Sequence, residues 1–173
     1  MRTRIKHKIL VLSTAFFFII TALMAQNIEV RKEGLFFNSH EIPRSASSKE
    51  LERIFGKPDR KSTMESTIWT YDNSGLRIYL KPDSLVLESF EFDFIKGEYN
   101  FSPKKTFPGV FMVNNNKISK TTSIDALSKI NDIHFHHEVL DLYRASTHDL
   151  NLVFTISDDN REIREVAISF KED

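Results

Sequence analysis

The sequence predicts an α+β fold of two tandem repeats, each a short helix packed on an antiparallel β-sheet. Two observations lead to this prediction. An apolar pattern occurs twice in the same order along the chain, and each copy contains a short capped helix followed by strands of alternating character. The predicted organisation is a signal peptide over residues 1–25, a first repeat over 26–96, a linker over 97–108 and a second repeat over 109–173.

The N-terminal segment has the composition of an export signal. Four Lys or Arg residues in the first eight positions precede a mainly apolar run, Ile9–Met24, which ends at Ala25. A basic start, an apolar centre and a small-residue boundary are typical of a secretory signal peptide. The alternative is an uncleaved membrane anchor, but this run of 16 residues spans about 24 Å as a helix, less than the roughly 30 Å hydrocarbon core of a bilayer. We therefore expect an exported protein, either periplasmic or secreted.

The expected mature part is slightly acidic and contains no cysteine. It carries 20 basic and 24 acidic side chains, which disfavours nucleic-acid binding and polybasic attachment to a membrane surface. The absence of cysteine excludes Cys nucleophiles and zinc–thiolate sites. A chain of this length buries enough surface to fold without a metal or a disulfide, so we expect no cofactor.

The internal repeat appears at an offset of 76 residues. Leu35–Asn38 then lies on Phe111–Asn114, and the apolar residues of two late strands coincide: Phe90, Phe92 and Phe94 with Val166, Ile168 and Phe170. At an offset of 74, Trp69 lies on Tyr143. The recurrence in one order favours duplication, and the alternative is chance similarity between two β-rich segments.

In the first copy the predicted elements follow from local signals. A strand at Leu35–Phe37 leads into a turn, and a helix begins at Ser47 because Ser47 and Glu50 fit a capping box. Gly56 suits the residue after the helix. The sequence then predicts a hairpin and a long strand, Thr67–Tyr71, Leu76–Leu80 and Leu85–Phe94.

The second copy repeats this order with weaker signals. A strand at Val110–Val113 precedes a helix that begins near Thr122. Three further strands are predicted at Val139–Tyr143, Leu150–Ile156 and Ile163–Phe170.

The first copy resembles a known family. The segment Glu50–Pro58 followed by Ile68–Tyr71 is similar to the helix, Gly-x-Pro and Trp-x-Tyr strand of small outer-membrane-assembly lipoproteins of the SmpA/BamE type. The tandem layout is similar to β-lactamase inhibitory proteins, and the chain also resembles uncharacterised exported proteins of Bacteroidota type. These resemblances imply a protein that binds a protein partner on its sheets. The second copy lacks Gly-x-Pro, and the cysteines of both families are missing, so no particular partner is implied.

The candidate partner-binding residues lie on the predicted sheet face opposite the helices. Leu76, Ile78 and Leu80 should face the core, which leaves Arg77 and Tyr79 on the other face, and Glu91 and Asp93 alternate with buried Phe in the same way. Aromatic and Arg residues are frequent anchors of protein interfaces. Trp69 and Tyr71 could also contribute, but we expect Trp69 to pack under the helix.

The leading hypothesis is therefore a non-enzymatic, exported protein-binding module with an envelope or secreted partner. The alternative is an envelope hydrolase whose site is dispersed in the sequence, since no local catalytic motif is present. His134, His136 and His137 form the densest group of potential metal ligands, but no third ligand stands at metal-site spacing, so we expect an exposed strand and no metal.

We predict that the mature protein begins at Gln26, or within two residues of it. The intact mass of the exported protein measures this directly. Recovery of the full-length chain from the membrane fraction would show that the segment is an anchor instead.

Overall fold

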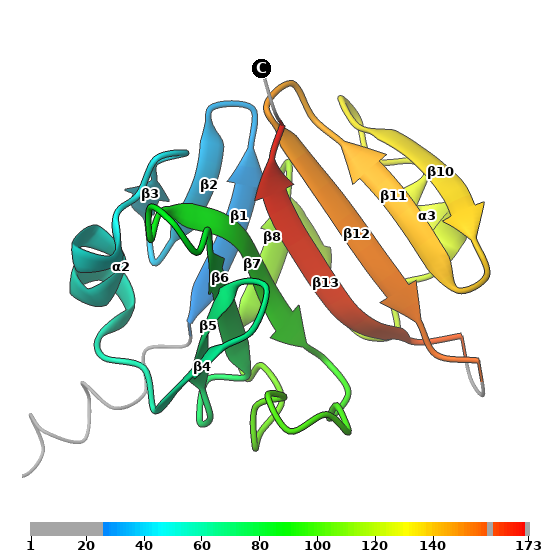
Figure 1. The fold of residues 1–173 in the computed structure, drawn as a ribbon. Coiled ribbons are helices and arrows are strands. Elements are labelled where there is room, and N and C mark those ends of the chain that lie inside the picture. Colours follow the sequence, from blue (N-terminus) through cyan, green and yellow to red (C-terminus); the bar gives the residue numbers. More distant parts are fainter. Residues whose placement is uncertain (1–25, 159–160, 172–173) are drawn as a thin grey trace, which may run out of the picture.

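The computed structural model describes residues 26–158 and 161–171, and the predicted signal peptide lies outside these residues. They form two β-sheets and two short helices (Figure 1). The five-stranded sheet has the order β3 (His40–Ile42), β2 (Gly34–Phe37), β1 (Asn27–Arg31), β8 (Val110–Val113) and β9 (Asn116–Ile118). The long sheet has eight strands in the order β10 (His134–Val139), β11 (Leu142–Ser146), β12 (Leu150–Ile156), β13 (Ile163–Phe170), β7 (Leu87–Asp93), β6 (Leu76–Leu80), β5 (Thr67–Tyr71) and β4 (Arg60–Thr63).

The predicted α+β class is wrong, because the fold is β-rich and its sheets are shared. In the described part of the chain the helices are only α2 (Ser48–Phe55) and α3 (Ile124–Leu127). Strands from both halves join edge to edge in each sheet, β7 to β13 in the long sheet and β1 to β8 in the five-stranded sheet. The edges of two separate sheets would leave backbone N–H and C=O groups unpaired, and the shared sheets satisfy them. Pairing of β1 with β8 is parallel, which the sequence pattern did not indicate.

Apart from β1, which has no counterpart in the second half, the two halves contain the same order of elements. In each half a two-stranded hairpin is followed by a short helix and four strands of the long sheet. The register between β7 and β13 is symmetric about the pair Glu91 and Ala167, which are 76 residues apart. This arrangement is what a duplicated chain related by a two-fold axis would give, and the division into two repeats remains a prediction.

Local signals in the sequence set the ends of α2 and the tight turns. The capping box is present: the Ser47 hydroxyl accepts a hydrogen bond from the Glu50 amide, and the Glu50 carboxylate accepts one from the Ser47 amide at 2.8 Å. Gly56 ends the helix with a φ of 80°. Asn38 and Asn114 adopt positive φ in the two equivalent hairpins, as Asn tolerates better than most residues.

The core lies between the two sheets and is rich in phenylalanine. Phe92 is fully buried, and its ring centroid is 6.2 Å from that of Phe90 and 4.9 Å from that of Phe111 in the five-stranded sheet. Phe55 joins α2 to this group at 5.4 Å from Phe90. Trp69 is only 3% exposed, which confirms that it packs inside.

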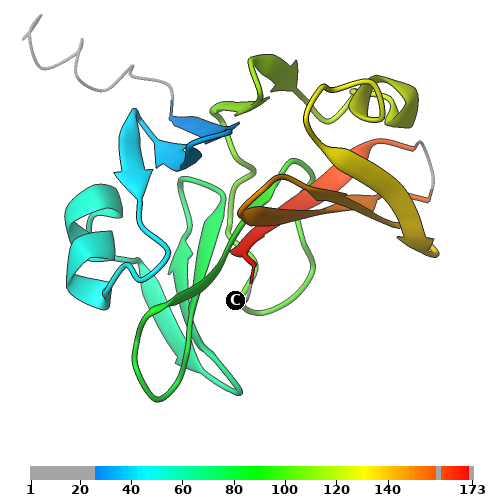
Figure 2. The same cartoon turned by 90° about the horizontal axis from the view of Figure 1, so that it is seen from above.

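The second face of the long sheet, which we call the outer face, is turned away from the five-stranded sheet. Figure 2 shows the two halves of the long sheet diverging from their junction at β7 and β13, with the helices and the five-stranded sheet on the other side. Segment 95–109 connects β7 to β8 and includes the predicted linker. It packs against the rest of the protein. Tyr99–Ser102 lie over the outer face, and Phe107 is buried against Phe92.

We predict that Phe92→Ala lowers the free energy of unfolding by about 3–5 kcal/mol, because truncation of a buried Phe leaves a cavity. Phe92 contacts rings from both sheets and from segment 95–109, so the cavity has few ways to close. Urea denaturation followed by circular dichroism measures the change. The control is Met64→Ala at an exposed turn, which should change the free energy by about 0.5 kcal/mol or less.

Candidate interaction face

A cluster of charged side chains occupies the outer face where β6, β7 and β13 meet. Arg77 is the cross-strand neighbour of Glu91, and Glu165 is the cross-strand neighbour of Asp93. The Arg77 Nη2 atom lies 2.7 Å from Asp93 Oδ1 and 3.4 Å from Glu91 Oε2, and it also donates to Glu165. One guanidinium therefore forms ion pairs with three carboxyl groups.

Two of the predicted partner-binding residues are not exposed. Arg77 and Asp93 are each 2% exposed, whereas Tyr79 and Glu91 are half-buried at the margin of the cluster. The expectation of an open face at Arg77 and Asp93 is therefore wrong. Segment 95–109 covers this part of the face, with the ring centroid of Phe101 5.7 Å from the Arg77 guanidinium carbon. The Gly and Pro residues of that segment predicted a linker, and nothing in its sequence indicated that it packs over Arg77.

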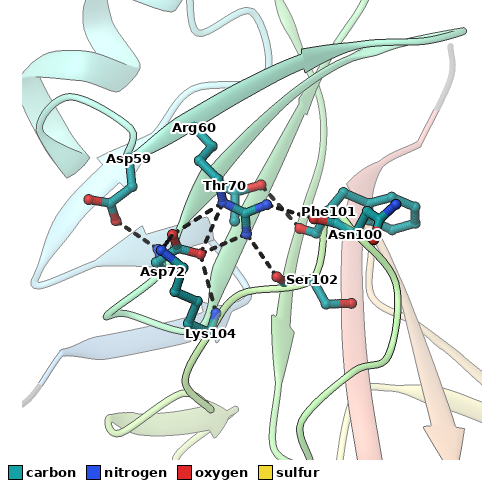
Figure 3. Close-up of polar contacts among 8 residues, drawn as sticks. All are labelled: Asp59, Arg60, Thr70, Asp72, Asn100, Phe101, Ser102 and Lys104. Carbon is teal, nitrogen blue, oxygen red and sulfur yellow. Dashed lines mark hydrogen bonds and ion pairs between the residues drawn. The ribbon is translucent and has the colours of Figure 1, made fainter.

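Segment 95–109 is fastened to the outer face by a second polar group (Figure 3). The Arg60 guanidinium donates to the backbone carbonyls of Asn100 at 2.6 Å and Ser102 at 2.9 Å. The Thr70 hydroxyl donates to the carbonyl of Phe101 at 3.1 Å. Three successive carbonyls are thus held by side chains of β4 and β5, and this fixes the cover over Arg77.

Asp72 orients the Arg60 side chain and also binds the same segment at Lys104. Its carboxylate accepts from Arg60 Nη2 at 2.7 Å and from the backbone amide of Lys104 at 3.2 Å. The Lys104 ammonium lies 3.1 Å from the same carboxylate, and the Asp59 carboxylate accepts from the Asp72 amide. The hydrogen bond from Arg60, helped by Lys104, lowers the pKa of Asp72 to about 2.

Burial acts in the opposite direction in the Arg77 cluster. Loss of solvent raises the pKa of Glu91 to about 7, although the Arg77 charge opposes the shift and Glu165 adds to it. Burial also raises the pKa of Asp93, again against the effect of Arg77. The pKa of Tyr79 is raised by burial and by the nearby Glu91. Between about pH 4.5 and pH 7, the raised pKa of Glu91 therefore favours a protonated carboxyl in the fold where an ordinary one would be ionised.

The outer face remains uncovered across β12 and β13 and at the start of β7. There the outward side chains are half-buried, whereas their inward neighbours are buried, as in the alternation of Asn151, Val153 and Thr155 with Leu150, Leu152, Phe154 and Ile156. In segment 95–109, Tyr99 is 69% exposed and stacks on Phe101, the residue that covers Arg77, with a centroid separation of 5.3 Å. Sequence reasoning missed Tyr99, because its segment carries no strand pattern, and it missed Glu165, which only the pairing of β13 with β7 brings to Asp93.

The histidine group lies on the edge strand β10, and its members are exposed. His137 Nε2 is 2.8 Å from the carbonyl of Leu140, and its ring packs 4.8 Å from that of Tyr143. Across residues 26–158 and 161–171, no three His, Asp or Glu side chains are arranged to hold a metal ion. The expectation that the protein needs no metal remains a prediction.

Residues 27–128 match the model of a protein family described as a domain of unknown function, DUF7738, and the chain belongs to this family. This match includes the first half and continues to the start of the second half. No curated protein matches the chain. The matching family is not one that the sequence resembles by its Gly-x-Pro and Trp-x-Tyr motifs, and those resemblances remain expectations.

Three solved structures are distantly similar. The chain covers 43% of an extracellular protein containing an SCP domain from Bacillus anthracis, with 72% of this chain aligned, 10% identity and a TM-score of 0.44. It covers 43% of a cysteine-rich secretory protein from Staphylococcus aureus, with 73% aligned, 12% identity and a TM-score of 0.43. It covers 82% of a DUF4309 family protein from Bacillus subtilis, with 76% aligned, 13% identity and a TM-score of 0.41. The chain thus spans less than half the length of the first two proteins, and such similarity defines no shared activity.

In the described part of the chain, no helix has both the length and the apolar character needed to cross a membrane.

We predict that stability falls as the pH rises from about 4.5 to about 7, and that Glu91→Gln makes this slope shallower. The pKa of Glu91 moves from 4.5 in an ordinary carboxyl to about 7 in the fold, so in this window the folded state keeps a proton that the unfolded chain has lost. A state that binds the proton is favoured at low pH, and one such proton changes the slope by up to about 1.4 kcal/mol per pH unit. The measurement is the free energy of unfolding in urea at several pH values.

The matched control is Glu98→Gln, which removes an exposed carboxylate from segment 95–109. It should leave the slope unchanged. An unchanged slope in Glu91→Gln as well would show that Glu91 does not hold the proton.

Proposed function

We propose that the protein is an exported, non-enzymatic module that binds an envelope or secreted protein through the outer face of its long sheet. The observation that carries the proposal is that this face is open across β12 and β13, whereas the inner face is filled by the core. A sheet face that neither a helix nor a second sheet covers must meet water or a partner. The export half of the proposal depends on the N-terminal sequence alone.

The proposed anchors are Tyr79 and Tyr99. Tyr99 is exposed, and it is held in place by its stacking on Phe101, so that little side-chain freedom is lost when a partner binds. Tyr79 and Glu91 stand at the margin of the open region. Arg77 and Asp93 contribute indirectly in this proposal, because they lie under segment 95–109 and position its aromatic residues.

The alternative of an envelope hydrolase has one observation in its favour, the raised pKa of Glu91 and Asp93. Catalytic carboxyl groups must also reach a substrate. Glu91 is half-buried, but Asp93 and Arg77 are each 2% exposed and Phe101 lies over Arg77, so a substrate that used both carboxyl groups would have to displace segment 95–109. The geometry therefore supports the binding module better.

We predict that truncation of an anchor weakens partner binding by about thirtyfold, equivalent to about 2 kcal/mol. A partner is first captured by a photo-crosslinking amino acid placed at position 99, in cells that export the protein. Its affinity for the purified wild type is then compared with its affinity for Tyr99→Ala and Tyr79→Ala. Circular dichroism confirms that both variants are folded.

The matched control is Phe36→Ala, because Phe36 is a half-buried aromatic residue of the five-stranded sheet, on the other side of the molecule. Its affinity should equal that of the wild type. Unchanged affinity in both tyrosine variants would place the interface elsewhere. Turnover of a substrate by the purified protein would move the hydrolase to first place.

A further inference from the structure

A groove of about 860 Å³ lies at the end of the outer face where β13 ends and β7 begins. This volume is within the range of ligand sites in proteins, about 300–1,000 Å³. The groove is at the opposite end of the β7–β13 junction from the Arg77 cluster, since Ser89 and Ser169 line the groove and the pair Asp93 and Glu165 marks the other end.

The floor of the groove is a row of three small hydrogen-bonding side chains. Ser89 on β7 is the cross-strand neighbour of Ser169 on β13, and Ser169 is the cross-strand neighbour of Asn151 on β12. All three are half-buried on the outer face. Adjacent strands are about 4.8 Å apart, so the row extends for about 10 Å across the sheet. It offers two hydroxyl groups and one amide to a ligand that lies across the strands.

The sides of the groove are basic, although the expected mature chain is acidic as a whole. Among the described residues that line it, Arg44, Lys81 and Lys171 stand with one acid, Glu88. The Lys171 ammonium donates to the carbonyl of Thr147 at 2.6 Å, and Glu88 accepts from the Ser66 hydroxyl at 2.7 Å. Among the described residues, the exposed Lys81 ammonium has no hydrogen-bond or ion-pair partner. A basic groove in an acidic protein selects anionic ligands by charge.

We propose that this groove binds an acidic, extended segment of the protein partner, with Lys81 pairing with a carboxylate and the floor residues bonding to the peptide groups. The proposal rests on the proposed function, because the groove floor is continuous with the open outer face. A row of side chains presents bonding groups at regular intervals along one line, which fits an extended chain better than a compact anion. Asn151 can both donate to a peptide carbonyl and accept from a peptide N–H, and the serines can do the same.

The test uses a fluorescein-labelled peptide of alternating Asp and Ser, titrated against the mature protein and followed by fluorescence anisotropy. The acidic peptide should bind at least tenfold more tightly than the matching Asn and Ser peptide. Its binding should weaken as salt rises from about 20 mM to about 150 mM, because salt screens exposed charges. In a nuclear magnetic resonance titration, the amide signals of Ser89, Asn151 and Ser169 should shift.

The decisive variant is Lys81→Glu, and its matched control is Lys129→Glu. Lys81 is an exposed turn residue whose backbone bonds to Val86 and Leu85 do not involve its side chain, so the fold should be kept. Lys129 is an exposed residue just beyond α3, outside the groove. We expect Lys81→Glu to weaken peptide binding at least tenfold and Lys129→Glu to leave it within twofold.

Several outcomes would overturn the inference: no preference for the acidic peptide, equal losses in the two variants, or tighter binding of a carboxylated oligosaccharide of equal charge than of the peptide. The peptide experiment needs no identified partner, so it is separate from the test of the proposed function. If the captured partner depends on Tyr99 while the peptide fails to bind, the groove inference fails and the proposed function stands. If the peptide binds at the groove while capture at position 99 fails, the groove inference stands and the tyrosine anchors do not.

Discussion

The antiparallel pairing of β7 with β13 is the interaction on which the rest of the structure depends. It joins the two halves into one sheet, and both the Arg77 cluster and the groove lie along it. At one end it brings Glu165 to Asp93, which completes the Arg77 cluster, and at the other end it brings Ser169 to Ser89, which begins the groove floor. Because neither half contains both members of these pairs, neither half alone could form the cluster or the groove.

Burial of the Arg77 cluster at this junction costs free energy. Moving charges out of water costs several kcal/mol per ion, and three carboxyl groups share one guanidinium. In the described part of the chain, Asp93 Oδ2 and Arg77 Nε have no hydrogen-bond partner, which adds to that cost. Protonation of a buried carboxyl group reduces this cost, which is why the pKa of Glu91 is raised. The pKa of Asp72 is lowered instead, because Arg60 donates a hydrogen bond to its ionised carboxylate. Arg77 therefore fixes an arrangement, and hydrophobic packing supplies most of the stability.

The sequence predicted what is local and missed what is distant. The capping box of Ser47 and Glu50 and the turn after Leu35–Phe37 depend on residues near one another in the chain, and these were confirmed, as was the burial of Trp69. The alternation of apolar and polar residues also predicted strands, but it gives no information on which strand pairs with which. Glu165 reaches Asp93 across 72 residues of sequence, and no local signal encodes this contact. Alternation also placed Arg77 on the outer face correctly, yet it could not show that segment 95–109 would cover that face.

The same cover explains why the two ends of the outer face differ. Where Arg60 and Asp72 hold segment 95–109, the face is closed, and the charges of Arg60 and Asp72 pair with each other within the protein. Toward Ser89 and Ser169 no described segment crosses the sheet in this way, and the exposed Lys81 ammonium beside the groove is left to meet water or a ligand. The hydrogen bonds of the β7–β13 ladder run through both ends, so the floor of the open end is as firmly spaced as that of the closed one. Because the ladder already fixes the backbone that carries this row of bonding groups, ligand binding need not order that backbone, which is a physical condition for recognition by a few contacts.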